Sequence, residues 1–317
     1  MTYQPATISD DFSNLPELPG WVTSGRAETL ETVAFRSGAA LTVLDQLISD
    51  ESYGVPLKLL ANRLALSAAT ATSKLEGRMA READIRDAYH LTPSGEARGP
   101  DGDLLAFWRA AVRLRIGGTG EIADLVGADV AGEVVVWLDA GLEWTRTHGP
   151  VAASVAILRA VLAADDQAER IACLLSDVVL ARALNWKAVL PVSAQRLTKA
   201  ALRELTAEGQ GAELAMQMRI LESIEEAIRL ARDLSYRAEA LCTVAPKLRA
   251  KGSGAAVALF LSEDAVAPST MLSPMIQGTS LPMTDRAARR FCDRLVELGV
   301  ARELTGRPTF RLYGIAP

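Results

Sequence analysis

Histidine and cysteine are scarce in this chain of 317 residues, which contains only His90, His148, Cys173, Cys242 and Cys292. The cysteines lie far apart, and no Cys-x-x-Cys pair or Cys/His cluster occurs. A disulfide framework or a zinc site needs such clustering, so we expect neither of them. Sites built from Asp and Glu stay open, but no pattern marks one. The sequence therefore predicts no metal and no cofactor.

Long apolar runs are also missing. The nearest to one, residues 151–164, is short and is interrupted by Arg159, whereas a membrane-spanning helix needs about 20 apolar residues. No Lys or Arg precedes Arg26, although a secretory signal begins with basic residues. We therefore expect no membrane segment and a cytoplasmic location.

Aromatic residues are few, at 5% of the chain, while alanine occurs 53 times. Strands favour aromatic and β-branched residues, and alanine is the best helix former. Apolar residues make up 49% and charged residues 23%, which is a globular balance. The composition therefore predicts an all-α protein.

Three regions differ in character. Residues 1–27 are rich in Pro, Ser and Asp and are expected to form an arm that Trp21 anchors. Residues 28–251 have helical spacing of apolar residues and should form an all-helical body. The run Gly252-Ser253-Gly254 is interpreted as a hinge, so that residues 252–317 form a separate C-terminal domain.

Helices of the body are placed by apolar spacing and by Gly and Pro positions. Residues 92–102 are expected to be a loop, and the Gly117–Gly120 run should end the preceding helix. The last pattern is unusually long, and Pro246 should kink or end it. The expected helices span 28–49, 56–75, 81–89, 103–116, 129–148, 151–163, 166–184, 194–208 and 213–251.

The C-terminal domain has a different pattern. Helices are expected at 255–262, 269–276 and 284–298, followed by a hairpin with arms at 300–304 and 309–313. Thr305-Gly306-Arg307-Pro308 would form its turn. Three helices followed by a two-stranded wing are the plan of a winged helix-turn-helix domain.

The charge of this domain supports that interpretation. Residues 284–317 contain seven arginines and four acidic residues, a net charge of +3 that leaves −8 on the rest of the chain. A basic module on an acidic body suits a polyanion such as nucleic acid. The arginines are Arg286, Arg289, Arg290, Arg294, Arg302, Arg307 and Arg311.

The position of these arginines matters more than their number. Arg286, Arg289 and Arg290 lie in the first two turns of the expected helix 284–298, opposite an apolar stripe that contains Phe291 and Cys292. The start of a recognition helix meets base edges in the major groove, where arginine pairs with guanine. The wing arginines would contact phosphate. We therefore predict binding of double-stranded DNA. The alternatives are a solvated helix face, or a winged helix that docks a protein.

The segments 283–291, 295–300 and 302–307 carry a resemblance. They resemble the winged helix at the C-terminus of many Fic-family proteins over about 50 residues. The whole chain also resembles an uncharacterised family of bacterial proteins of similar length, often plasmid-associated, that carries this winged helix. The resemblance implies an architecture and no reaction.

A second fragment, Thr72-Ser73-Lys74-Leu75-Glu76-Gly77, resembles the inhibitory-helix motif of Fic proteins. In that family the Glu holds an arginine of the catalytic loop. The catalytic loop, His-Pro-Phe-x-x-Gly-Asn-Gly-Arg, is absent here. The resemblance implies that Glu76 inhibits a separate Fic enzyme. The alternative is a helix that ends at Gly77 and leaves Glu76 solvated.

Other motifs are weak. The Gly117–Gly120 run lacks the Gly-Lys-Ser/Thr of a phosphate loop and is interpreted as a plain loop. The tryptophans Trp108, Trp137, Trp144 and Trp186 are expected to pack in the core.

Nothing marks a catalytic nucleophile, so we expect no enzyme. The leading hypothesis is a regulator or plasmid-maintenance factor that binds DNA, with a possible homodimer seam along 213–251 and a possible protein partner of the body. The alternative is a non-enzymatic adaptor of a Fic-type or segregation-type system.

Overall fold

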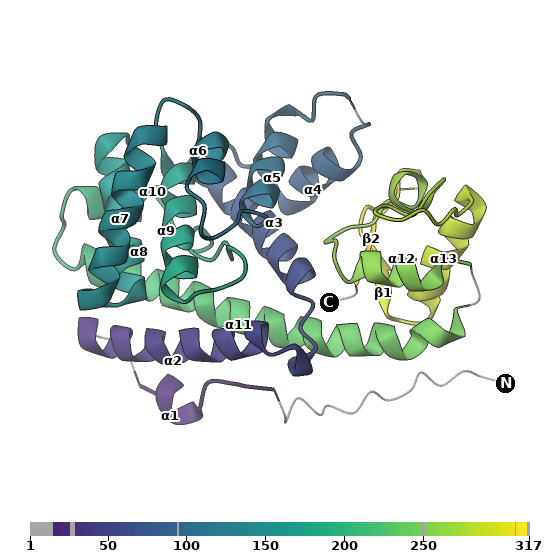
Figure 1. Cartoon of the computed structure of the whole chain (residues 1–317), viewed down its shortest axis with the longest axis horizontal. Coiled ribbons are helices and arrows are strands. Elements are labelled where there is room, and N and C mark those ends of the chain that lie inside the picture. The colour runs from purple at the N-terminus through teal and green to yellow at the C-terminus, as the bar shows by residue number, and fades with distance from the viewer. Residues whose placement is uncertain (1–14, 26–28, 94, 249–250, 308, 316–317) are drawn as a thin grey trace.

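The computed structural model in Figure 1 describes residues 15–25, 29–93, 95–248, 251–307 and 309–315. It is built mainly from helices, and its strands β1 (Ala301–Glu303) and β2 (Tyr313–Ile315) form one small antiparallel sheet within this part of the chain. The prediction of an all-α fold is confirmed at this level. Figure 1 shows α7–α10 at one end of the molecule and α12, α13 and the strands at the other.

The remaining elements follow in chain order. The first half contains α1 (Gly20–Thr23), α2 (Leu30–Ser49), η2 (Glu51–Tyr53), α3 (Leu57–Leu75), α4 (Glu82–His90), α5 (Gly99–Ala111), α6 (Gly120–Val126) and α7 (Ala131–His148). The second half contains α8 (Pro150–Ala164), α9 (Glu169–Ala183), α10 (Lys199–Thr206), α11 (Ala212–Val244), η3 (Ala245–Lys247), α12 (Ser253–Phe260), η4 (Pro268–Leu272) and α13 (Asp285–Glu297).

Helix α11 links the two ends of the molecule. Its 33 residues extend about 50 Å, and α2 packs along its first half (Figure 1). Arg36 of α2 donates two hydrogen bonds to Glu225 of α11, at 2.6 and 2.9 Å. Pro246 follows the last α-helical turn, which confirms the prediction that this proline ends the helix. The apolar face of α11 is buried inside the chain. The homodimer seam expected along 213–251 stays a prediction.

Helices α7, α8 and α9 pack closely because Gly141 lets them approach. A Cβ at Gly141 would lie 2.8 Å from the Val179 side chain and 2.9 Å from that of Ile157. Two of the expected core tryptophans are fully or almost fully buried, Trp108 and Trp186, and Trp137 is partly buried against the core. The prediction for Trp144 is wrong: its side chain is 40% exposed and stacks on His148 at the end of α7, with 4.0 Å between ring centroids.

Several boundaries differ from the sequence prediction. The expected loop 92–102 is shorter, because Pro100 starts α5 inside it, where a proline needs no backbone N–H partner. Helix α5 ends at Ala111 rather than Ile116. Helix α10 is shorter than expected and begins where Thr198 accepts a hydrogen bond from the Ala201 N–H, at 3.2 Å. Ser253 and Gly254, interpreted as part of a hinge, form the first turn of α12.

The hairpin also differs from its prediction. The register pairs Ala301 with Ile315 and Glu303 with Tyr313, so the second strand lies three residues beyond its expected centre. Phe310 has a positive φ of 55°, which a strand cannot contain. The Glu303 carboxylate accepts the backbone N–H groups of Thr305 and Gly306, both at 2.8 Å, and closes the turn instead.

Candidate nucleic-acid interface

Helix α13 is held with one face in the core. Thr284 caps it, since its Oγ1 accepts the Ala287 N–H at 3.3 Å. The apolar stripe is buried, with Phe291 4% exposed and Cys292 fully buried. Burial also raises the pKa of the Cys292 thiol, so this cysteine packs as a small core residue. The opposite face of α13 is left at the surface.

All four arginines of α13 lie on that exposed face. Arg289 pairs with Asp285 and Arg294 with Glu297, both at 2.8 Å and both along the helix surface, where ion pairs contribute little and exchange readily. Among the described residues, Arg286 and Arg290 have no ion-pair partner. The face therefore presents two unengaged guanidinium groups and two weakly engaged ones.

The three arginines of the hairpin are exposed too. Arg307 lies 3.3 Å from Asp87 of α4, which ties the loop to the body. Arg311 donates its Nε–H to the Arg307 carbonyl at 3.1 Å. Phe310 lies between them in the chain and was not predicted as a site residue, because its sequence pattern indicated a strand. Its side chain is 71% exposed on a loop that carries two arginines.

A buried charge cluster joins the C-terminal module, which runs from α12 to β2, to helices α4 and α5 of the body. Asp264, 2% exposed, accepts a hydrogen bond from Arg109 of α5 and contacts His90 of α4. Arg109 also pairs with Glu263. Burial alone would raise the pKa of the Asp264 carboxyl, but His90, Arg109 and Arg63 hold it well below its ordinary range. Sequence reasoning missed this cluster, whose one local signal was an arginine beside Trp108 on a largely apolar helix.

Side chains of α3 and α4 also hold the strands. Arg63 donates to the Ile315 carbonyl and Arg86 to the Leu304 carbonyl, both at 3.1 Å. Asn62 donates to the carbonyl of Ser262, at 2.7 Å. These bonds, together with the Asp264 cluster, fix the orientation of the C-terminal module on the body. Helix α13 lies at the end of the molecule away from α7–α10 (Figure 1).

The Fic-like fragment is engaged within the chain. Thr72 is buried and its Oγ1 accepts the Trp108 Nε1–H at 3.0 Å. Gly77 has a positive φ of 78° just beyond the end of α3, as the alternative interpretation expected. The same alternative also expected a solvated Glu76, and this part of it is wrong. The Glu76 carboxylate pairs with Arg170 of α9 at 2.6 Å and with Arg78 at 2.7 Å.

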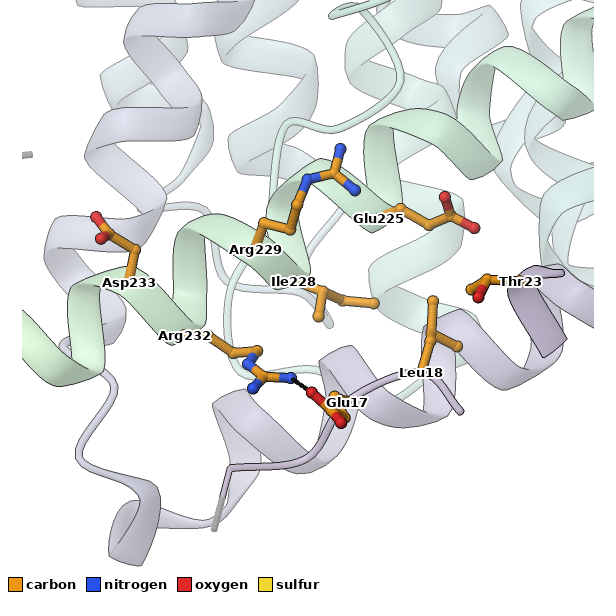
Figure 2. Close-up of a pocket in the computed structure, with 8 residues that line it drawn as sticks. All are labelled: Glu17, Leu18, Thr23, Glu225, Ile228, Arg229, Arg232 and Asp233. Atoms are coloured by element: carbon orange, nitrogen blue, oxygen red, sulfur yellow. Dashed lines mark hydrogen bonds and ion pairs between the residues drawn. The ribbon is translucent and has the colours of Figure 1, made fainter. Parts of the chain in front are cut away.

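A pocket lies elsewhere, between α11 and the segment that leads into α1 (Figure 2). Its volume is about 510 Å³, and an ion pair of 2.6 Å between Arg232 and Glu17 crosses it. Its lining mixes acidic and basic side chains, so no ligand charge is favoured.

In the described ranges the structure contains no group of three His, Cys, Asp or Glu side chains placed to hold a metal ion. No helix in them is long and apolar enough to cross a membrane.

Comparison with known proteins gives a family match. No curated protein matches the chain. Residues 6–315 match a family whose description is "Protein of unknown function (DUF1403)". This match covers nearly the whole chain. The chain therefore belongs to the DUF1403 family.

Proposed function

We propose that this protein binds double-stranded DNA through α13 and the loop between β1 and β2, and acts as a regulator or plasmid-maintenance factor. The observation that carries the proposal is the exposed face of α13, where Arg286 and Arg290 are unengaged within the described residues. A helix with one face anchored in the core and a basic outer face can enter a major groove.

The order of the C-terminal elements supports a winged helix. Helix α12 is followed by the extended residue Val266, η4, α13 and the hairpin. Val266 exchanges two backbone hydrogen bonds with Tyr313 of β2, at 2.7 and 2.9 Å, which adds a third extended segment to the sheet. In this interpretation α13 is the recognition helix and the β1–β2 loop is the wing.

The charge distribution favours binding of DNA over binding of an uncharged partner. Arginines neutralise phosphates and release counterions, so affinity should fall steeply as salt rises. The net charge of −8 outside residues 284–317 opposes contact of the rest of the chain with DNA. The C-terminal arginines would then set the orientation of the bound duplex.

Fluorescence anisotropy with a labelled duplex at two salt concentrations tests the proposal. Replacing Arg286 and Arg290 by alanine should weaken binding about tenfold or more and flatten the salt dependence. The matched control replaces Arg113 and Arg203, which are exposed on the body, and changes the net charge equally. Absence of binding by the native chain at low salt would overturn the proposal, as would equal losses in both double variants.

Docking of a protein by the same module is the second candidate. Phe310 and Val296 expose apolar side chains beside the arginines, at 71% and 39%. Exposed aromatic side chains flanked by arginine are common at protein interfaces. Under this alternative, replacing Phe310 by Ser would abolish capture of a host protein, while the native chain would show no salt-dependent affinity for duplex DNA.

A further inference from the structure

The buried stripe of α13 fixes how the helix is turned about its own axis. Its residues are all 4% exposed or less, namely Ala288, Phe291, Cys292 and Leu295. Each residue of an α-helix advances by about 100° around the axis, so this stripe covers about 100° of the helix surface. The opposite side of α13 therefore points away from the core, and its side chains are the ones that can reach into a groove of DNA.

Two arginines lie at the middle of that outward side, and we call them the central pair. Arg286 and Arg290 are four residues apart, so they lie about one turn apart along the helix and within about 40° of each other around it. Both side chains are exposed, and neither has an ion-pair partner in the part of the chain that the structure describes. All of their hydrogen-bond donors are available to a ligand.

Two further arginines flank the central pair on opposite sides. By the same advance per residue, Arg289 lies about 80° to one side of the pair and Arg294 about 60° to the other. Each is already paired with a carboxylate along the helix, that of Asp285 and that of Glu297. When a helix lies in the major groove, the middle of its outward side meets base edges and its flanks face the sugar-phosphate backbones. The flanking arginines are therefore positioned for phosphate and the central pair for bases.

Acidic residues restrict the contact to the first half of α13. Asp293 and Glu297 continue the line of the central pair toward the end of the helix, and both are exposed. Asp293 also accepts a hydrogen bond from the Tyr313 hydroxyl, at 3.2 Å. Because carboxylates repel phosphate, the second half of the helix is kept at the edge of the groove. The base contacts of α13 are then made by its first two turns.

The chemistry of the central pair selects guanine. Guanine presents two acceptors in the major groove, N7 and O6, which match the two parallel N–H groups of a guanidinium, whereas adenine presents one acceptor and one donor. Residues three apart on a zinc-finger helix contact successive bases. The central pair, with a similar spacing, is therefore matched to neighbouring base pairs.

From this geometry we propose that Arg286 and Arg290 each bind one of two neighbouring guanines on the same strand, while Arg289 and Arg294 bind phosphates on either side of them. The inference rests on the proposed function, since it names the bases that α13 contacts in duplex DNA. It assigns sequence preference to two residues and general affinity to the other two.

Selection from a library of duplexes with a randomised centre tests the proposal, with the full native chain at low salt. The retained duplexes should share two neighbouring guanines. Fluorescence anisotropy on a retained duplex then measures each contact. Replacing either guanine by adenine should weaken binding about fivefold or more. Replacing it by 7-deazaguanine, which lacks N7 but still pairs with cytosine, should also weaken binding.

Lysine variants separate base contacts from charge. Arg286→Lys and Arg290→Lys keep the charge but lose the planar fork, so each should lose the preference for one of the two guanines and keep the salt dependence of binding. The matched controls Arg289→Lys and Arg294→Lys make the same change on the flanks of the helix and should keep both preferences.

The outcomes distinguish this inference from the proposed function. Salt-dependent binding of duplexes without a preference for guanine would overturn the inference and leave DNA binding intact. A guanine preference that survives both central lysine variants would overturn the assignment to Arg286 and Arg290. Absence of binding to any duplex at low salt would overturn the proposed function, and the inference with it.

Discussion

The His90 Nε2 lies 3.3 Å from both carboxylate oxygens of Asp264, although 174 positions separate the two residues in the chain. Arg109 contacts the same carboxylate from a third element, and all three side chains are nearly sealed from water. A buried ion pair of this kind contributes little more to the free energy of unfolding than apolar packing would. Removing one partner, however, leaves the other charge buried without compensation. The cluster therefore specifies how the C-terminal module sits on α4 and α5.

The first prediction concerns this junction. Asp264→Asn should lower the free energy of unfolding by about 3–5 kcal/mol, because Arg109 keeps its charge in a buried place with half of its partners removed. Urea unfolding followed by circular dichroism measures the change. The control Asp124→Asn removes an exposed carboxylate and should change stability by less than about 0.5 kcal/mol.

The junction should also respond to acid. The pKa of Asp264 is lowered in the folded state, so its contribution to stability is present above the ordinary aspartate pKa of 3.8 and is lost as the pH falls below that value. The native chain should lose stability on acidification more steeply than Asp264→Asn. Parallel acid profiles for the two proteins would contradict the assignment.

Asp177 should have the opposite pH dependence. Burial raises its pKa to about 7, although the Ser193 and Val192 N–H groups donate to Oδ1, and its Oδ2 has no hydrogen-bond partner among the described residues. The folded state then holds a proton that the unfolded state releases, so stability should fall between about pH 4 and 7, by on the order of 4 kcal/mol.

Asp177→Asn removes this titration and keeps an oxygen for the two N–H groups. The free energy of unfolding of the variant should equal that of the native chain near pH 4 and exceed it at pH 8. Urea unfolding across this range measures both proteins. A stability difference independent of pH would contradict the raised pKa of Asp177.

The β1–β2 loop allows a test of the wing. Asp87 lies 3.3 Å from Arg307 and also pairs with Arg86. If the loop contacts phosphate, Asp87→Asn should raise DNA affinity about two- to fivefold at low salt, because it frees Arg307 and removes a repulsive charge. Glu51→Gln changes the net charge equally at an exposed position and is the control. Fluorescence anisotropy measures both, and unchanged affinity in Asp87→Asn would exclude Arg307 from the interface.

Two glycines of α7 give a matched test of packing. Gly141→Ala places a methyl group 2.8 Å from Val179 and 2.9 Å from Ile157 and should destabilise the chain by about 1–3 kcal/mol. Gly132→Ala on the same helix meets no atom within 4 Å and should stabilise it by about 0.5–1 kcal/mol. Thermal unfolding should show Tm shifts of opposite sign.

Helical content and the two faces of α13 could be predicted from residue order, because capping and apolar periodicity act within a few residues. Thr284 caps α13 and Phe291 is buried as its spacing indicates. Pro246 ends α11 for an equally local reason, the missing N–H of proline.

Contacts between distant segments were decided by packing alone. The partners of His90, Glu76 and Arg63 lie 174, 94 and 252 positions away in the chain, and no local pattern encodes such separations. Tyr313 of the shifted β2 likewise pairs with Val266, a residue before η4 that lies 47 positions away in the chain. Backbone and charged groups buried by packing must find partners wherever the fold brings them, and the linear order of residues does not specify that place.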